Sequence, residues 1–162
     1  MPRYKQDNED RLTISTPTDE DPTLVVCPQC GGMAKVFPFG EQPQIGYSMR
    51  VVCTKCSYAK TKTDTSQTYY WSEEDPTDSY FEYPLYLKMR CCSSSLWVFN
   101  RRHLEFLEQF VSAGLRERRQ GEHGWSNSAL ASRLPKWLQS AKNRKPVMAC
   151  LAKLRELGCY SV

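Results

Sequence analysis

The sequence predicts an α+β protein in which an antiparallel sheet built from hairpins precedes a set of C-terminal helices. Three observations predict this class. Apolar residues alternate with polar ones on both sides of two cysteine pairs, and the same two-residue period returns around residues 85–99. From residue 100 onward, apolar residues recur at the three- and four-residue spacing of amphipathic helices.

The two cysteine pairs are C-x-x-C motifs, Cys27 with Cys30 and Cys53 with Cys56, and 22 residues lie between them. Two such turns facing each other supply the tetrahedral four-sulfur shell that Zn²⁺ prefers. Disulfides would need an oxidising compartment, a redox dithiol would need a βαβ context, and an iron–sulfur cluster would be coloured. The pairs predict one structural Zn²⁺, because a closed four-thiolate shell has no place for an activated water.

The flanks of the two pairs predict a zinc ribbon over residues 24–62. Leu24 and Val26 lead into the first pair, and Tyr47, Met49 and Val51 alternate into the second. Between the pairs, Phe37 and Phe39 are predicted to be core residues under the sheet rather than a contact surface. An alternating stretch, residues 85–89, and an apolar run, residues 96–99, predict a hairpin that extends the ribbon's sheet, so that the ribbon domain covers residues 24–99.

Residues 1–23 are polar, acidic and interrupted by proline, which predicts an extended or disordered arm with at most a short strand near residues 11–15. Residues 100–162 are predicted to form the helical part. Asn100 can cap a helix over residues 101–119, with apolar residues on one face. Further helices are expected over 126–134, 135–142 and 146–157, giving three or four helices that pack on one another or on the sheet.

The charge is distributed unevenly along the chain. Residues 1–89 carry 9 Lys and Arg against 13 Asp and Glu, and residues 90–162 carry 13 against 5. No apolar run is long enough to cross a bilayer, and the N-terminus does not resemble a signal peptide. We therefore expect a cytoplasmic protein, in which the eight cysteines serve as thiolate ligands or buried thiols.

Two surfaces are candidates for partner binding. The segment 64–83 mixes aromatic rings with carboxylates and would suit a basic protein surface; its candidate residues are Tyr69, Tyr70, Trp71, Glu73, Glu74, Asp75, Asp78 and Tyr80. The alternative for these residues is that the rings pack on the sheet and the acids face water. A basic cluster in the C-terminal part would instead suit nucleic acid; its residues are Arg133, Lys136, Lys142, Arg144 and Lys145.

The remaining cysteines and the histidines indicate no second site. Cys91, Cys92, Cys150 and Cys159 could form another metal site with His103 or His123, but isolated cysteines more often behave as small buried hydrophobic residues. His103 has no nucleophile, phosphate loop or carboxylate pair beside it in the sequence. It is predicted to pack or hydrogen-bond, and no catalytic residue is assigned.

The C-terminal half resembles a known family. The run Leu96-Trp97-Val98-Phe99-Asn100, the following stretch 103–108, and later Ser132-Arg133-Leu134-Pro135-Lys136-Trp137 with 141–144 are similar to small, largely uncharacterised bacterial proteins. These carry a zinc ribbon of the transcription-factor-IIB type ahead of a helical tail. The resemblance covers residues 24–157 and implies a fold and a bacterial cytosolic setting.

The function expected from the sequence is non-enzymatic binding of a macromolecule. A protein partner is favoured, as for an immunity or inhibitor protein that blocks a toxin. The alternative is a nucleic-acid-binding accessory protein that uses the basic C-terminal helices, and a small-molecule substrate or a membrane is not expected.

Overall fold

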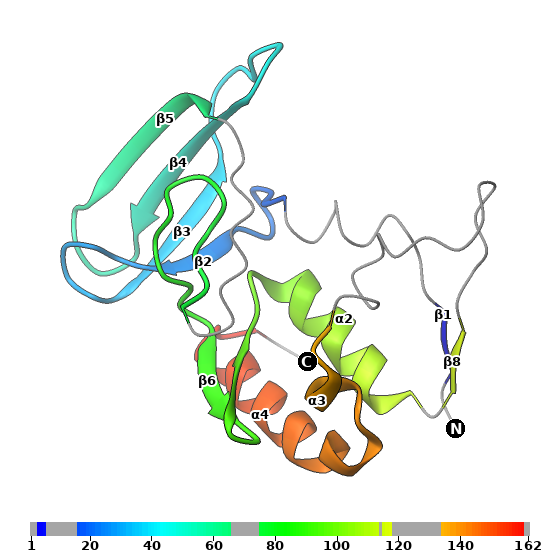
Figure 1. Cartoon of the computed structure of the whole chain (residues 1–162). Helices are drawn as coiled ribbons and strands as arrows, with labels where there is room; N and C mark the ends of the chain where they lie inside the picture. The colour runs from blue at the N-terminus through cyan, green and yellow to red at the C-terminus, as the bar shows by residue number, and fades with distance from the viewer. Residues whose placement is uncertain (1–2, 6–15, 66–74, 114, 118–133, 161–162) are drawn as a thin grey trace.

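The structure, a computed structural model, describes residues 3–5, 16–65, 75–113, 115–117 and 134–160, and it confirms the α+β class. Four strands form an antiparallel sheet in chain order: β2 (Thr23–Val26), β3 (Met33–Pro38), β4 (Tyr47–Cys53) and β5 (Ala59–Thr65). Figure 1 shows these strands as one layer, with β2 nearest to the helices and β5 at the far edge.

Two smaller sheets and the helices complete the described part of the chain. β6 (Lys88–Cys91) pairs with β7 (Ser94–Trp97) in an antiparallel hairpin, and β1 (Arg3–Lys5) pairs in parallel with β8 (Leu115–Glu117). The helical elements are α2 (Arg101–Ser112), α3 (Lys136–Gln139), the 3-10 turn η2 (Ala141–Asn143) and α4 (Arg144–Leu157). The strand expected near residues 11–15 lies outside the described residues. So do residues 126–133 of the helix expected over 126–134, and Leu134 itself is not helical.

One face of the four-stranded sheet is buried. Val36 lies opposite Val51 and Ala34 opposite Cys53, so these side chains share a face, and all of them are buried. The chain after β5 returns to cover this face with the rings of Tyr80 and Phe81. We call the resulting cluster the sheet core, formed by Val25, Cys27, Ala34, Val36, Met49, Val51, Cys53, Tyr80, Phe81, Leu85 and Phe99.

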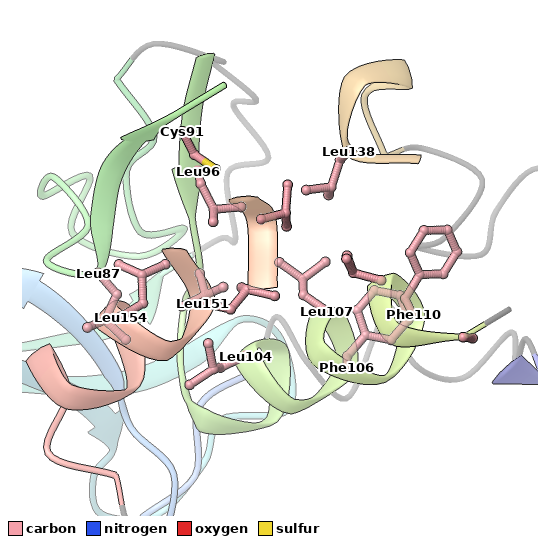
Figure 2. Close-up of a cluster of buried hydrophobic side chains, with 14 of the residues drawn as sticks. Leu87, Cys91, Leu96, Leu104, Phe106, Leu107, Phe110, Leu138, Leu151 and Leu154 are labelled. Atoms are coloured by element: carbon pink, nitrogen blue, oxygen red, sulfur yellow. The ribbon is translucent and has the colours of Figure 1, made fainter. Parts of the chain in front are cut away.

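A second cluster, the helical core, joins α2 and α4 to the β6–β7 hairpin (Figure 2). The apolar face of α2 meets Val147, Leu151 and Leu154 of α4, and the hairpin adds Leu87 and Leu96. Strand β2 lies between the two cores: Leu24 belongs to the helical core and the adjacent Val25 to the sheet core. Because alternate residues of a strand face opposite sides, burial on both faces explains the continuous apolar run at β2.

The hairpin was expected to extend the ribbon's sheet. Its ends do pair with the edge of β2, through a bridge between Val25 and Leu85, but the ladder of β6 and β7 does not continue that sheet. β6 and β7 form a sheet of their own that packs in the helical core. Only the chain that leads into and out of the hairpin touches the edge of β2, where the Val26 N–H donates to Pro84 O at 2.8 Å and the Leu24 N–H to Phe99 O at 3.0 Å. The apolar side chains of the hairpin are buried against α4, which decides its position.

The N-terminus of α2 is capped twice. The Asn100 side chain accepts from the His103 N–H at 2.9 Å, as the sequence predicts. The Asp21 carboxylate accepts from the backbone N–H groups of Arg101 and Arg102 at 2.9 and 3.0 Å, and it also pairs with the Arg102 guanidinium at 2.9 Å. A carboxylate at this position neutralises the positive end of the helix dipole and ties the N-terminal segment to α2.

Helix α2 ends at Ser112, earlier than the predicted residue 119. Ala113 adopts an extended conformation, and residues 115–117 pair with β1. The C-terminal carbonyls of α2 are instead satisfied from α4, because the Arg144 guanidinium donates to Val111 O at 3.0 Å and to Ala113 O at 3.4 Å. A cation at this end of a helix is favourable for the same dipole that favours Asp21 at the other.

His103 is a packing and hydrogen-bonding residue, as predicted. Its ring stacks on Phe99 with centroids 5.4 Å apart and meets Trp97 edge to face. Its Nδ1 accepts from the Phe99 N–H at 3.1 Å, so this nitrogen is unprotonated. Burial lowers the pKa of His103 to about 3, which keeps the ring neutral in the folded protein.

Removing the Asp21 carboxylate should destabilise the protein. We expect Asp21→Ala to lower the free energy of unfolding by about 1–3 kcal/mol, because two helix N–H groups lose their acceptor and the Arg102 guanidinium loses its partner. Chemical denaturation followed by circular dichroism measures the change. Asp19→Ala is the matched control because Asp19 is exposed; an equal loss in both variants would contradict the capping role.

Acid should destabilise the protein through His103. The pKa of His103 is lower in the folded state than in the unfolded state. The stability that the neutral ring contributes is therefore complete above the unfolded pKa of about 6.5, and it is lost as the pH falls from there toward about 3. Between pH 7 and pH 5 the expected loss reaches about 2 kcal/mol. His103→Asn retains an acceptor near the position of Nδ1 and does not titrate, so its pH profile should be flatter; parallel profiles for both proteins would count against this assignment.

Candidate metal site

The four cysteines of the two C-x-x-C motifs lie on two turns at one end of the sheet. In the β2–β3 turn, the Cys27 N–H donates to Gly32 O at 2.8 Å and the Gly31 N–H to Cys27 O at 2.9 Å. In the β4–β5 turn, the Cys53 N–H donates to Tyr58 O at 2.9 Å. Because β3 pairs with β4 in a register that places Ala34 opposite Cys53, both turns lie at the same end of the sheet.

The second turn is fastened to the first through Thr54. Its backbone N–H and its side-chain hydroxyl both donate to Met33 O, at 2.9 and 2.8 Å. These bonds hold the two turns against each other independently of the sulfur atoms. The backbone therefore prepares the site that the cysteines complete.

The four sulfurs converge on one point. Cys27 Sγ lies 3.7 Å from Cys56 Sγ, Cys30 Sγ lies 3.5 Å from Cys53 Sγ, and all four lie within 4.8 Å of one another. Four sulfurs bound tetrahedrally at about 2.3 Å from a common ion would be about 3.8 Å apart. A disulfide needs about 2.05 Å, and the cysteines are free thiols. The cluster could hold one metal ion, and its geometry is consistent with zinc.

Backbone N–H groups point at these sulfurs, as expected of a site for thiolates. Cys53 Sγ accepts from the N–H groups of Cys56 and Lys55 at 3.4 and 3.3 Å, which lowers the pKa of Cys53 to about 6. Cys56 accepts one such bond, from Tyr58 at 3.5 Å, but burial and the three neighbouring thiols raise the pKa of Cys56 to about 12. Four thiolates this close repel one another, so full ionisation requires a cation among them.

Gly32 and Lys55 are parts of the site that the sequence analysis missed. A Cβ on Gly32 would lie 2.9 Å from Lys55 Cδ and 3.3 Å from Cys30 Sγ, so the side chain of Lys55 passes directly over the first turn. This contact leaves no room for a side chain at Gly32. The signal available in the sequence was the pair Gly31-Gly32 directly after Cys30.

The remaining cysteines form no comparable cluster. Among the residues that the structure describes, no other group of three or more metal-ligating side chains comes close enough to share an ion. Cys91 is buried, its Sγ lies 3.9 Å from Cys92 Sγ, and burial raises the pKa of its thiol. Cys159 is exposed, and His123 lies outside the described residues. The buried cysteine packs in the helical core as a small apolar side chain.

The candidate protein-binding surface loses two of its residues to the interior. The Asp78 carboxylate is 1% exposed and accepts from the N–H groups of Tyr80, Phe81 and Tyr83 at 3.0, 2.8 and 2.7 Å. Tyr80 is 4% exposed and packs in the sheet core. Both residues therefore build a loop and do not face a partner, because the backbone of this loop needs an acceptor that its own carbonyls do not supply.

The other six residues of the candidate protein-binding surface are either exposed or outside the described residues. Asp75 is exposed and pairs with Lys88 at 3.2 Å, an interaction that contributes little at the surface. Five of its members lie outside the described residues: Tyr69, Tyr70, Trp71, Glu73 and Glu74.

The candidate nucleic-acid surface is also reduced. Lys136, Lys142 and Lys145 are exposed on or near α3, η2 and α4. Arg144, in contrast, is committed to the C-terminal carbonyls of α2. Arg133 lies outside the described residues. Of the five residues, Lys136, Lys142 and Lys145 remain as exposed cations.

Phe37 and Phe39 are not core residues, contrary to the prediction. Phe37 is half-buried, Phe39 is 42% exposed, and neither belongs to the sheet core or the helical core. The register explains their placement, because Phe37 lies opposite Arg50 on the face of the sheet that points away from the sheet core. Alternation alone could not show which face would be covered.

No protein-family model, curated protein or solved structure matches the chain. Within the described part of the chain, no helix has the length and apolar character needed to span a bilayer.

Loss of one ligand should remove the ion and loosen the sheet. We expect Cys56→Ser to release the bound metal and to lower the free energy of unfolding by at least about 3 kcal/mol, since binding of a structural Zn²⁺ contributes about 10–16 kcal/mol in small domains. Metal analysis and thermal melting measure both effects. Cys159→Ser, at an exposed cysteine outside the cluster, should leave both unchanged; equal behaviour of the two variants would show that the cluster holds no structural ion.

Proposed function

We propose that the chain is a non-enzymatic binding protein whose sheet is braced by one structural Zn²⁺ in a zinc-ribbon arrangement. The observation that carries this proposal is the convergence of Cys27, Cys30, Cys53 and Cys56 within 4.8 Å at the end of two paired hairpins. The resemblance to small bacterial zinc-ribbon proteins belongs to the same proposal. It agrees with the placement of both cysteine pairs on hairpin turns.

The donor set supports zinc in particular. Thiolates are soft ligands that select Zn²⁺, Cu(I) and iron centres, and tetrahedral four-sulfur geometry is typical of zinc and of iron–sulfur sites. Four protein ligands complete the preferred coordination of Zn²⁺, so no position is left for water or substrate. The ion would act by holding two turns together.

The size of the sheet supports a bracing role. The four strands span residues 23–65, and small units of this kind rarely obtain enough stability from apolar burial alone. Near the cysteines the sheet core ends at Cys27 and Cys53 themselves, so the sulfur cluster takes the place of an apolar contact there. Closing both turns with one ion would fix the register of β2, β3 and β4.

A role in binding, without catalysis, is supported by how the polar groups are used. The Asp78 carboxylate accepts from three backbone N–H groups, the His103 ring is neutral among other rings, and Arg144 caps a helix. Each of these three polar groups serves the fold.

Metal analysis and cobalt substitution test the proposal. We expect the purified full chain to contain one zinc per molecule and to be colourless. The Co²⁺ form should show the intense absorption of a tetrahedral four-thiolate site, and added azide or cyanide should not change it, because the shell is closed. A spectrum that changes with these anions would mean an open position and would favour a catalytic metal; a red or brown protein would mean iron.

A further inference from the structure

Opposite the sheet core, the part of the sheet formed by β3, β4 and β5 from Lys35 onward belongs to neither core and carries aromatic and cationic side chains. The register places Lys35, Val52 and Ala59 in one row across β3, β4 and β5, and Phe37, Arg50 and Thr61 in the next. We call the outer face the set formed by Lys35, Phe37, Phe39, Arg50, Val52 and Thr61.

The outer face differs in burial from the other side of the same strands. The neighbouring rows on the opposite side, Val36 with Val51 and Ala34 with Cys53, are buried in the sheet core. On the outer face, Lys35 and Thr61 are exposed, Phe37 and Arg50 are half-buried, and no ring belongs to either core. Two phenylalanines that belong to neither core, one of them 42% exposed, need a physical reason.

The side chains of the outer face combine flat rings with positive charge. The Arg50 guanidinium lies 4.7 Å above the centre of the Phe39 ring, which keeps its charge at the surface in a stacked geometry. Lys35 adds a second cation in line with Phe37 along β3. The set holds no carboxylate to repel an anion. This combination is complementary to a chain that alternates negative charge with flat, stackable groups.

We propose that the outer face binds single-stranded nucleic acid, with bases stacked on Phe37 and Phe39 and phosphates beside Lys35 and Arg50. Exposed aromatic residues on a β-sheet are a general means of binding unpaired bases, and nearby cations follow the backbone. A duplex hides the faces of its bases, so it can use the charges and not the rings. The inference rests on the proposed function, because the ion would fix the register that aligns these side chains.

The dimensions of the sheet suit a short stretch of extended strand. Residues two apart on a strand lie about 6.8 Å from each other on the same face, so Lys35 and Phe37 on β3, with Phe39 just past its end, cover about 14 Å. Arg50 and Val52 on β4 widen the platform to a second strand. Such a surface accommodates two stacked bases and their adjoining phosphates, which predicts sequence-tolerant binding.

Titration of the full chain with fluorescein-labelled oligothymidylate and oligouridylate tests this. With two phosphate contacts, the logarithm of the binding constant should fall against the logarithm of salt concentration with a slope of about −1.4 between about 50 and about 200 mM salt. Lys35→Ala should reduce the slope by about 0.7, and Phe39→Leu should weaken binding at least about fivefold with little change in slope. A duplex of the same length should bind more weakly.

The matched control is Lys142→Ala, which removes an equally exposed lysine from η2 in the basic cluster. It should leave the affinity and the slope unchanged. Binding that depends on Lys142 and not on Lys35 or Phe39 would overturn the inference in favour of the helical surface. Tighter binding of the duplex, or no binding of either oligonucleotide, would overturn it as well.

Metal content separates the two proposals. A folded chain that holds one zinc but binds no oligonucleotide contradicts only the role of the outer face, and would leave a protein partner as the remaining class. A chain without zinc contradicts the proposed function itself. Melting curves of the Lys35→Ala and Phe39→Leu proteins should match the parent, since both side chains are exposed; a folded variant with parental affinity would count directly against the role of its residue.

Discussion

The approach of four thiol groups to within 4.8 Å of one another is the constraint on which the sheet depends. Thiolates that close repel, and neutral thiols offer only weak hydrogen bonds, so the sulfur cluster has no strong cohesion of its own. The proposed Zn²⁺ turns the same four groups into its strongest connection. The Thr54 bonds to Met33 and the passage of Lys55 over Gly32 place the two turns before any ion is bound.

Strand β2 connects this sheet to the rest of the molecule. Its alternate side chains enter two different cores, and its free edge receives backbone bonds from the chain around the β6–β7 hairpin. Asp21, just before β2, caps helix α2. Cys27 follows directly after the strand, so a single short segment links the candidate metal site, both cores and the helix. Loss of a ligand in the sulfur cluster should therefore destabilise both cores as well as the two turns.

The parts of the fold that the sequence predicted are those with local causes. The C-x-x-C spacing located all four ligands, and Asn100 marked the start of α2, because each signal lies within a few residues of its effect. The Asp21 and Arg144 caps were not predictable, since each acts on a helix far away in the sequence. The early end of α2 has the same origin: residues 115–117 pair with β1 near the other end of the chain, which no helical period reveals.

The candidate partner surfaces show a second limit. Rings and carboxylates in 75–83 suggested a contact surface, but the loop needed Asp78 for its own N–H groups and Tyr80 for the sheet core. Phe37 and Phe39 suggested core and lie outside it. The two-residue alternation of a strand indicates which residues share a face, but it does not indicate which face is covered. The covered face is the one on which the chain after β5 packs, and this tertiary contact cannot be predicted from the alternation.

X-ray absorption at the metal edge of the purified chain measures the central claim most directly. The account predicts a zinc edge whose first shell contains four sulfur atoms at about 2.3 Å and no nitrogen or oxygen. A shell containing oxygen or nitrogen would contradict the closed site, and a chain without zinc would contradict the bracing ion itself.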